Sequence, residues 1–265
     1  MKLINIGYII SFAISFFFLV PAEAQELKYT PEKNVHSHND YMQNVPFYTA
    51  YSSRCASIEA DVFLRNGELL VAHEEKDIKS DRTLKALYLD PIRKEMTLNH
   101  GCGYSGGNGF QLMVDFKDDT KATLQVLVKQ LLEYMECFDV FNNPAAVRVV
   151  ISGYVLSPDE LKNYPSIIYF DGFPNVNYTE EQSKRVPQIS LSFEDLSSWN
   201  GVGNMTTADY KKVKTVVDSI HATGKKVRFW DTPDTEDAWR EFMKLGVDLI
   251  NTDQPTKISQ FLFNH

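Results

Sequence analysis

Acidic residues occupy alternate positions in two short segments that have the apolar composition of buried strands. Glu59 and Asp61 alternate with apolar residues in 57–63, and Asp115 does so in 111–117. Successive side chains of a strand point to opposite faces, so an apolar face packed under helices leaves the carboxylates pointing inward. Inward carboxylates repel one another and lose hydration. Three oxygen ligands without a thiolate therefore predict one divalent cation, Ca²⁺ or Mg²⁺.

Lys117 shares the inward face with Asp115, which leaves a second interpretation of the acidic cluster. In that interpretation the lysine neutralises the carboxylates and no ion is bound. One lysine cannot balance three carboxylates, so we favour the cation site. The Lys117 ammonium group is then placed to stabilise negative charge that grows on a substrate oxygen.

Two histidines are placed to work with the carboxylates. His36 ends the predicted strand 34–36 and His73 follows the run 68–72, so both are expected at the mouth of the fold. Imidazole titrates near neutral pH, and the pair can share proton transfer as base and acid, in either order. His36 and His38 also fit a two-histidine metal motif. Such a binuclear site needs further histidines from later strands, and the middle of the chain has none.

Strand-like and helical patterns alternate along the chain. The candidate strands are residues 34–36, 57–63, 111–117, 147–153, 166–171, 188–193, 226–230 and 248–252, with helical patterns at 120–138, 206–222 and 235–245. Asn66-Gly67 predicts a hairpin between the second strand and the run 68–72. Eight strands alternating with helices predict a (β/α)8 TIM barrel, with an open doubly wound sheet as the alternative. In a barrel the chemistry lies at the carboxyl ends of the strands.

The first 24 residues have the pattern of a secretory signal peptide. Lys2 precedes the apolar run 6–20, and Ala22-Glu23-Ala24 forms a cleavage site. We expect cleavage after Ala24, which leaves residues 25–265 as a single barrel domain. The mature protein is therefore predicted to be secreted or periplasmic.

An exported protein can form disulfides, and this chain has three cysteines. Cys55 and Cys102 are the more favoured pair. Cys137 lies in an apolar helical stretch and is expected to be a buried free thiol.

The charge balance excludes several classes of partner. The 265 residues include 35 acidic and 27 basic side chains, a net charge of −8. Nucleic-acid-binding proteins usually carry a basic surplus, so no nucleic-acid partner is expected. The acidic surface argues against adhesion to anionic lipid. The ordinary globular composition excludes a polytopic membrane protein, and we expect no stable membrane insertion.

The motifs resemble those of glycerophosphodiester phosphodiesterases. That family has a His on the first strand, then Glu-x-Asp-Val, a turn with Gly and a second His, followed by an acid-x-Lys strand and a closing Gly-x-Asp…Thr-Asp-x-Pro segment. The matching residues here are 35–36, 58–62, 66–67, 71–73, 113–117 and 246–255. The superfamily also includes phosphatidylinositol-specific phospholipases C and sphingomyelinase D-like enzymes. The resemblance implies a TIM barrel, a divalent cation held by Glu59, Asp61 and Asp115, and phosphodiester cleavage with His36 and His73 as the acid–base pair.

The chain departs from the family after the first histidine. The family has Arg-Gly there and this chain has Ser37-His38. Asn39 lies three residues after His36, as in the sphingomyelinase D-like branch, and is the candidate to take over the phosphate contact of that Arg. Trp230 ends a predicted strand and is expected to form a wall of the site, and Asp171 ends another and is placed to contact a polar head group.

These features predict a secreted phosphoric diester hydrolase that acts on a glycerophosphodiester or a phospholipid head group. Two alternatives stay open. One is a barrel that binds phosphorylated head groups without cleaving them. The other is a phosphomonoesterase or another metal-dependent hydrolase. In each case the expected partner is a small phosphorylated substrate.

Overall fold

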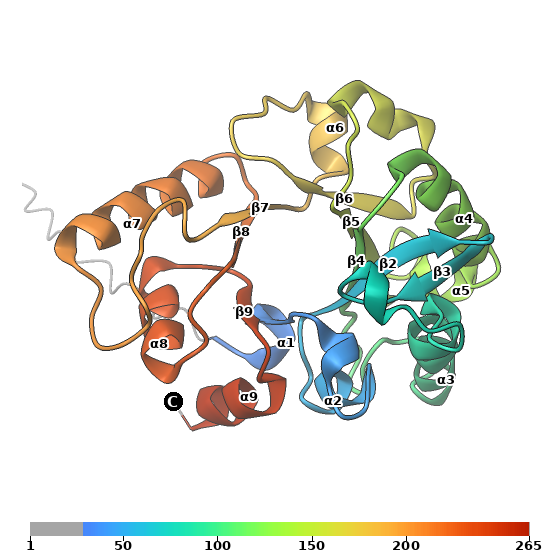
Figure 1. The fold of residues 1–265 in the computed structure, drawn as a ribbon, viewed down its shortest axis with the longest axis horizontal. Coiled ribbons are helices and arrows are strands. Elements are labelled where there is room, and N and C mark those ends of the chain that lie inside the picture. Colours follow the sequence, from blue (N-terminus) through green and yellow to red (C-terminus); the bar gives the residue numbers. More distant parts are fainter. Residues whose placement is uncertain (1–28, 265) are drawn as a thin grey trace, which may run out of the picture.

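Parallel strands surround a central axis and helices cover their outer faces in the computed structural model (Figure 1). The structure describes residues 29–264, so the predicted signal peptide lies outside the described residues. Within this part the sheet order is β8-β7-β6-β5-β4-β2-β1-β9, and β3 pairs with β2 in antiparallel fashion. A parallel bridge between Arg228 and Leu249 links the first and last strands of this order. The predicted single-domain TIM barrel is thus confirmed.

The strand bounds follow the predicted runs closely. The barrel strands are β1 (Val35–Ser37), β2 (Ser57–Arg65), β4 (Gln111–Phe116), β5 (Arg148–Ser152), β6 (Ile168–Gly172), β7 (Gln188–Ser192), β8 (Lys226–Trp230) and β9 (Ile250–Thr252). The hairpin strand β3 (Glu68–Val71) follows the Asn66-Gly67 turn, in which both residues have positive φ.

Two of the longer helices begin at threonine caps that the sequence indicates. The α-helices are α1 (Pro31–Asn34), α2 (Tyr48–Ser52), α3 (Asp90–Leu98), α4 (Thr120–Leu132), α5 (Met135–Phe138), α6 (Glu180–Lys184), α7 (Thr207–His221), α8 (Glu236–Leu245) and α9 (Pro255–Phe263). The Thr206 and Thr235 side chains accept the N–H groups of Asp209 and Ala238 and start α7 and α8. The predicted helix 120–138 is two helices, because the chain turns at residues 133–134.

The two faces of the strands have opposite chemistry, as their alternation predicts. The outward side chains of β2 and β4, such as Ile58 and Val114, are buried in the core under the helices. The inward positions of the barrel are largely polar, and several are buried, including His36, Ser57, Glu59, Gln111 and Arg228. A barrel interior with this many polar groups is built for binding or chemistry rather than for stability alone.

The cysteines of the described chain are free thiols, so the favoured Cys55–Cys102 pair does not form. Cys55 is fully buried in the core, and burial raises the pKa of its thiol. Cys137 is a buried free thiol in α5, as predicted. Among the described residues no helix combines the length and the apolar character that a membrane span requires.

Candidate active site

The three predicted metal ligands converge where the first half of β2 runs beside β4, close to the carboxyl end of β4. Asp61 and Asp115 face each other in the register of these neighbouring strands. Glu59, Asp61 and Asp115 each offer one oxygen, and these oxygens lie within 4.8 Å of one another. That spacing suits Ca²⁺, whose ligand oxygens lie about 2.3–2.6 Å from the ion. Asp61 Oδ1 is buried and has no hydrogen-bond partner, so the cluster has an acceptor that the protein leaves unused.

Two cationic side chains balance part of this charge. Lys117 Nζ lies 2.8 Å from both Asp61 Oδ2 and Asp115 Oδ2. Arg228, from β8, places Nη2 2.9 Å from Glu59 Oε2. Three carboxylates against two cations leave one negative charge. The cluster therefore needs a proton or a further cation to be neutral. Burial and the neighbouring Glu59 raise the pKa of Asp61 to about 6, which shows that uptake of a proton is favoured there.

His36 lies beneath the acidic cluster rather than at the mouth. Its side chain is 0 % exposed, with Nε2 2.6 Å from Glu59 Oε2 and Nδ1 2.8 Å from Ser57 Oγ. Burial lowers the pKa of His36 to about 4, so the ring is neutral at pH 7. The carboxylate can only accept, so Nε2–H donates to Glu59 and Nδ1 accepts from the Ser57 hydroxyl. The expectation that His36 reaches the mouth is wrong, because its ring is fully occupied in orienting Glu59.

His73 does reach the mouth, beside Asp61. Its side chain is half exposed, and Nδ1 lies 3.3 Å from Asp61 Oδ2 and 3.2 Å from the Tyr41 hydroxyl. The Tyr41 hydroxyl lies 2.7 Å from Asp61 Oδ2 and 2.6 Å from Asn39 Oδ1. Tyr41 thus connects the histidine, the acidic cluster and Asn39. The sequence contains no signal that singles Tyr41 out for this position.

His38 is the second histidine at the mouth. Its Nδ1 lies 2.8 Å from Asp253 Oδ1, and its side chain is 28 % exposed. Burial opposes protonation, but the hydrogen bond to Asp253 and the charge of Glu59 raise the pKa of His38. His38 and His73 therefore each present Nδ1 to a carboxylate, which leaves each Nε2 directed elsewhere.

Asp40 holds the loop that carries His38. Its buried carboxylate accepts hydrogen bonds from the Ser37 hydroxyl, the Phe47 N–H and the Tyr88 hydroxyl. Burial raises the pKa of Asp40 to about 6, while these donors oppose the shift. The His36–Tyr41 stretch therefore combines one residue that anchors the loop with several that face the site.

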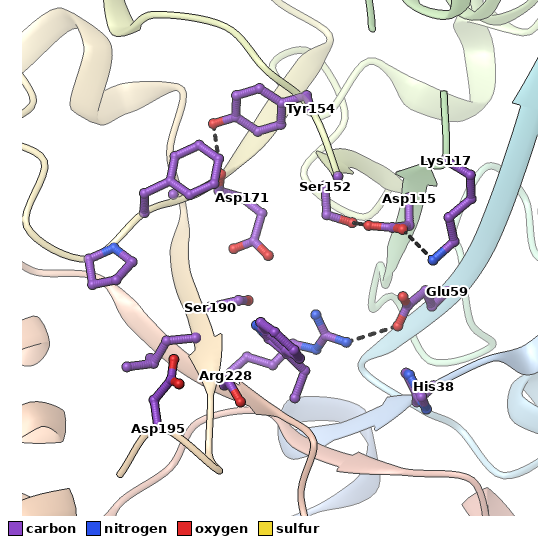
Figure 2. A pocket seen from close by; sticks show the side chains of 17 residues that line it. His38, Glu59, Asp115, Lys117, Ser152, Tyr154, Asp171, Ser190, Asp195 and Arg228 are labelled. Carbon is purple, nitrogen blue, oxygen red and sulfur yellow. Dashed lines mark hydrogen bonds and ion pairs between the residues drawn. The ribbon is translucent and has the colours of Figure 1, made fainter. Parts of the chain in front are cut away.

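A cavity of about 490 Å³ opens at the carboxyl ends of the strands. Figure 2 shows His38, Glu59, Asp115 and Lys117 on one side, and Asp171 and Ser190 across from them. Trp230 is 42 % exposed and lines this cavity, where it was expected to form a wall. Asn39 contacts both Tyr41 and His38, and neither Asn39 nor His73 is among the described residues that line the cavity.

Arg228 is the main site residue that lies outside the sequence motifs. It follows Lys226 and precedes Trp230 at alternate positions of β8, so strand phase alone places it inward. Its guanidinium contacts Glu59, the Asn251 amide oxygen and the Met113 sulfur. The same alternation that identifies Glu59 and Asp61 would have found it.

A (β/α)8 barrel with a carboxylate cluster and two histidines beside it combines groups that can hold a cation with groups that can transfer protons. Residues 27–153 match the family described as AIM6-like phosphodiesterase domain, and residues 226–256 match the glycerophosphoryl diester phosphodiesterase family. Both matched segments contain motifs that resemble glycerophosphodiester phosphodiesterases, so the two family matches agree with the resemblance that the sequence predicts.

Individual proteins are similar to this chain over most of its length. "Altered inheritance of mitochondria protein 6 homolog" from Arthroderma benhamiae is 29 % identical, over 83 % of this chain and 80 % of that protein. A calcium-dependent phosphoinositol-specific phospholipase C from Pseudomonas sp. is similar in structure, with a TM-score of 0.52 and 11 % identity over 88 % of this chain and 93 % of the other. A protein from Agrobacterium tumefaciens assigned as a glycerophosphoryl diester phosphodiesterase has a TM-score of 0.50 and 15 % identity. The likeness covers 88 % of this chain and 98 % of the other. At these identities the two solved structures support the fold alone.

Proposed function

We propose that this protein is a metal-dependent phosphoric diester hydrolase in which His38 and His73 transfer protons. The observation that carries the proposal is their matched geometry beside one acidic cluster. Each histidine offers Nδ1 to a carboxylate, Asp253 for His38 and Asp61 for His73. A carboxylate on Nδ1 fixes the ring orientation and leaves Nε2 for proton transfer. His36 is buried and bonded at both nitrogens, so its role is to position Glu59.

Glu59, Asp61 and Asp115 would hold one divalent cation, Ca²⁺ or Mg²⁺. The donor set fits, because it consists of carboxylate oxygens and includes the unpartnered Asp61 Oδ1. A bound cation would supply charge compensation for the phosphate and polarise its oxygens. The cluster with Lys117 and Arg228 carries one net negative charge, so a divalent cation makes it +1, which complements a diester monoanion.

The residues of the chain then divide the work. One histidine accepts the proton of the attacking hydroxyl at Nε2, and the other donates a proton to the leaving alcohol oxygen. Lys117 stabilises the charge that develops on the phosphoryl oxygens. A neighbouring hydroxyl of the substrate is already positioned for attack and has the proximity advantage over water, so a cyclic phosphate is the expected first product.

Cleavage of glycerophosphoinositol, a diester with a hydroxyl beside its phosphate, in the presence of Ca²⁺ or Mg²⁺ tests the proposal directly; bis-p-nitrophenyl phosphate lacks such a hydroxyl and should be cleaved much more slowly. His38→Ala and His73→Ala should each reduce the rate by roughly 10²–10⁴-fold. His221→Ala is the matched control, because His221 pairs with Asp248 away from the cavity. His36→Ala should weaken cation binding, measured by calorimetry, because His36 positions Glu59. It should leave the pH profile of the rate nearly unchanged. Wild-type rates in both the His38 and His73 variants would refute the mechanism.

The same assay separates the alternatives. A phosphomonoesterase would cleave p-nitrophenyl phosphate faster than the diester, and a binding barrel would cleave neither. Export is a separate proposal that depends on the leader 1–24, and the intact mass of the mature protein tests it, with Gln25 as the expected first residue.

A further inference from the structure

A second cavity lies at the opposite end of the barrel from the mouth. It has a volume of about 190 Å³, and its lining residues start a strand or belong to a segment that leads into one. Among them, Arg148 is the first residue of β5 and Lys226 is the first residue of β8. The amino-terminal ends of the barrel strands therefore enclose this cavity, away from the acidic cluster.

Strand phase directs both cationic side chains into the barrel. Lys226 has the same phase as Arg228, whose side chain points inward. Arg148 is the register partner of Gln111, which donates a hydrogen bond to the inward-facing Ser57. The two cations thus face one cavity, although their strands are not neighbours in the sheet.

Neither cation has an anionic partner in the described part of the chain. Arg148 Nε is buried and has no hydrogen-bond partner, and its guanidinium lies over the Tyr169 ring, 5.1 Å from the centroid. Lys226 is exposed, and its ammonium group takes part in no hydrogen bond or ion pair. Buried donors in native proteins are nearly always paired, so an unpaired one beside a cavity indicates a ligand that supplies the acceptor.

Two acidic side chains lie near this cavity, and both are engaged elsewhere. Glu32 accepts hydrogen bonds from Arg54 and from Asn108, one at each carboxylate oxygen. Asp248 pairs with His221, with Oδ2 and Nε2 2.7 Å apart. The protein itself therefore supplies no free acid to the two cations.

The two cations also repel each other. Desolvation lowers the pKa of Lys226, Asp248 opposes this shift, and the like charge of Arg148 adds to it. An anion between the two groups would offset the repulsion and give Arg148 Nε an acceptor. A guanidinium presents a planar fork of N–H groups that matches phosphate oxygens, and an ammonium adds a point charge beside it. At about 30 Å³ per water molecule, the cavity has room for such an ion.

We propose that Arg148 and Lys226 form a binding site for an inorganic tetrahedral oxyanion, phosphate or sulfate, at the amino-terminal end of the barrel. The ion accepts hydrogen bonds from both side chains and so connects β5 to β8 across the interior. This site goes beyond the proposed function, because neither residue belongs to the cation site or to the groups that transfer protons.

Inorganic phosphate is the probe, with the protein in EDTA and at a pH above the Asp61 pKa of about 6. The acidic cluster then keeps its net negative charge and repels phosphate from the mouth. Phosphate and sulfate should both raise the Tm of wild type relative to chloride at the same ionic strength, because they bind the folded state. By calorimetry, Arg148→Met and Lys226→Met should each weaken phosphate binding at least about tenfold, the loss expected for a hydrogen bond between charged groups.

Two other lysines provide the controls. Lys129→Met removes an exposed charge on α4 outside both cavities, and Lys117→Met removes a cation at the mouth. Both variants should keep the wild-type phosphate affinity. If Lys129→Met loses as much affinity as the site variants, phosphate only screens the surface. If Lys117→Met does so, the ion binds at the mouth. Either result overturns the proposed site, as does an equal rise in Tm with chloride.

The site variants should fold, because each removes one of two like charges. Without phosphate, the Tm of Arg148→Met and of Lys226→Met should equal or exceed that of wild type. Arg148→Lys, which keeps the charge, should bind phosphate more tightly than Arg148→Met. Wild-type crystals in selenate give a direct check that needs no variant. Anomalous density between the two side chains would support the site, and its absence at a selenate concentration that raises the Tm would overturn it.

Discussion

Replacement of Arg228 by methionine should destabilise the whole barrel. Arg228 and Glu59 form an ion pair in which both side chains are nearly fully buried, at 5 % and 6 % exposed. Methionine fills part of the volume but leaves the Glu59 carboxylate buried with only His36 beside it. Removal of one partner from a buried pair typically costs about 3–5 kcal/mol, because the remaining charge is uncompensated. For a domain of this size that corresponds to a fall in Tm of roughly 6–20 °C.

Urea unfolding followed by circular dichroism, in EDTA, measures this cost. Arg240→Met is the matched control, because Arg240 pairs with Glu236 and Asp237 on the surface of α8. An exposed pair contributes about 0–1 kcal/mol, so the control should stay within that range.

A double-mutant cycle with Glu59→Gln isolates the pair itself. In the Glu59→Gln background, Arg228→Met should cost at least about 1 kcal/mol less than in wild type, because no buried carboxylate is left behind. An equal cost in both backgrounds would show that Arg228 acts through Asn251 and packing instead. A loss below about 1 kcal/mol in the single variant would refute the charge argument altogether.

Three further predictions concern a cap, a proton and the cation site. Thr235→Ala removes the side-chain oxygen that accepts the Ala238 N–H and should cost about 1 kcal/mol of unfolding free energy, measured in urea, with Thr215→Ala inside α7 as the control. Asp253→Asn should lower the pKa of His38, so the limb of the pH–rate profile that reports His38 moves to lower pH. Because the pKa of His38 is higher in the folded protein than the unfolded value of 6.5, protonated His38 stabilises the fold. The stability difference between wild type and Asp253→Asn should therefore be largest near pH 5–6. It should vanish as the pH rises through the folded-state pKa. Asp61→Asn should bind Ca²⁺ more weakly by calorimetry yet keep or raise the metal-free Tm, because it relieves repulsion from Glu59 and Asp115; unchanged Ca²⁺ affinity would remove Asp61 from the ligand set.

The fold could be predicted because its signals are local and periodic. The eight strand runs, the Asn66-Gly67 turn and the threonine caps at 206 and 235 each depend on a few neighbouring residues. The Cys55–Cys102 pair failed for the opposite reason. Disulfide formation depends on the distance and direction of two side chains that the sequence does not place relative to each other.

The acidic cluster could be predicted because strand phase and strand order are enough to bring Glu59, Asp61 and Asp115 together. Lys117 followed from the same phase. Tyr41 could not be found in this way, since it lies in the short helical turn Asp40–Met42 after β1 and reaches Asp61 across the mouth. Loop residues have no periodicity that assigns them a direction, so their contacts depend on tertiary structure.

Alternation along a strand predicts which face a side chain lies on, but not how deep it lies along the barrel axis. That depth distinguishes the two histidines in His36-Ser37-His38. Both have the same phase, but two residues of strand separate them by about 7 Å. The lower ring meets Glu59 and Ser57 and is buried, whereas the upper one meets Asp253 and faces the cavity. A neutral, buried imidazole bonded at both nitrogens cannot exchange a proton with a substrate. Our proposal therefore assigns proton transfer to His38 rather than His36, on the basis of where β1 ends and not of residue type.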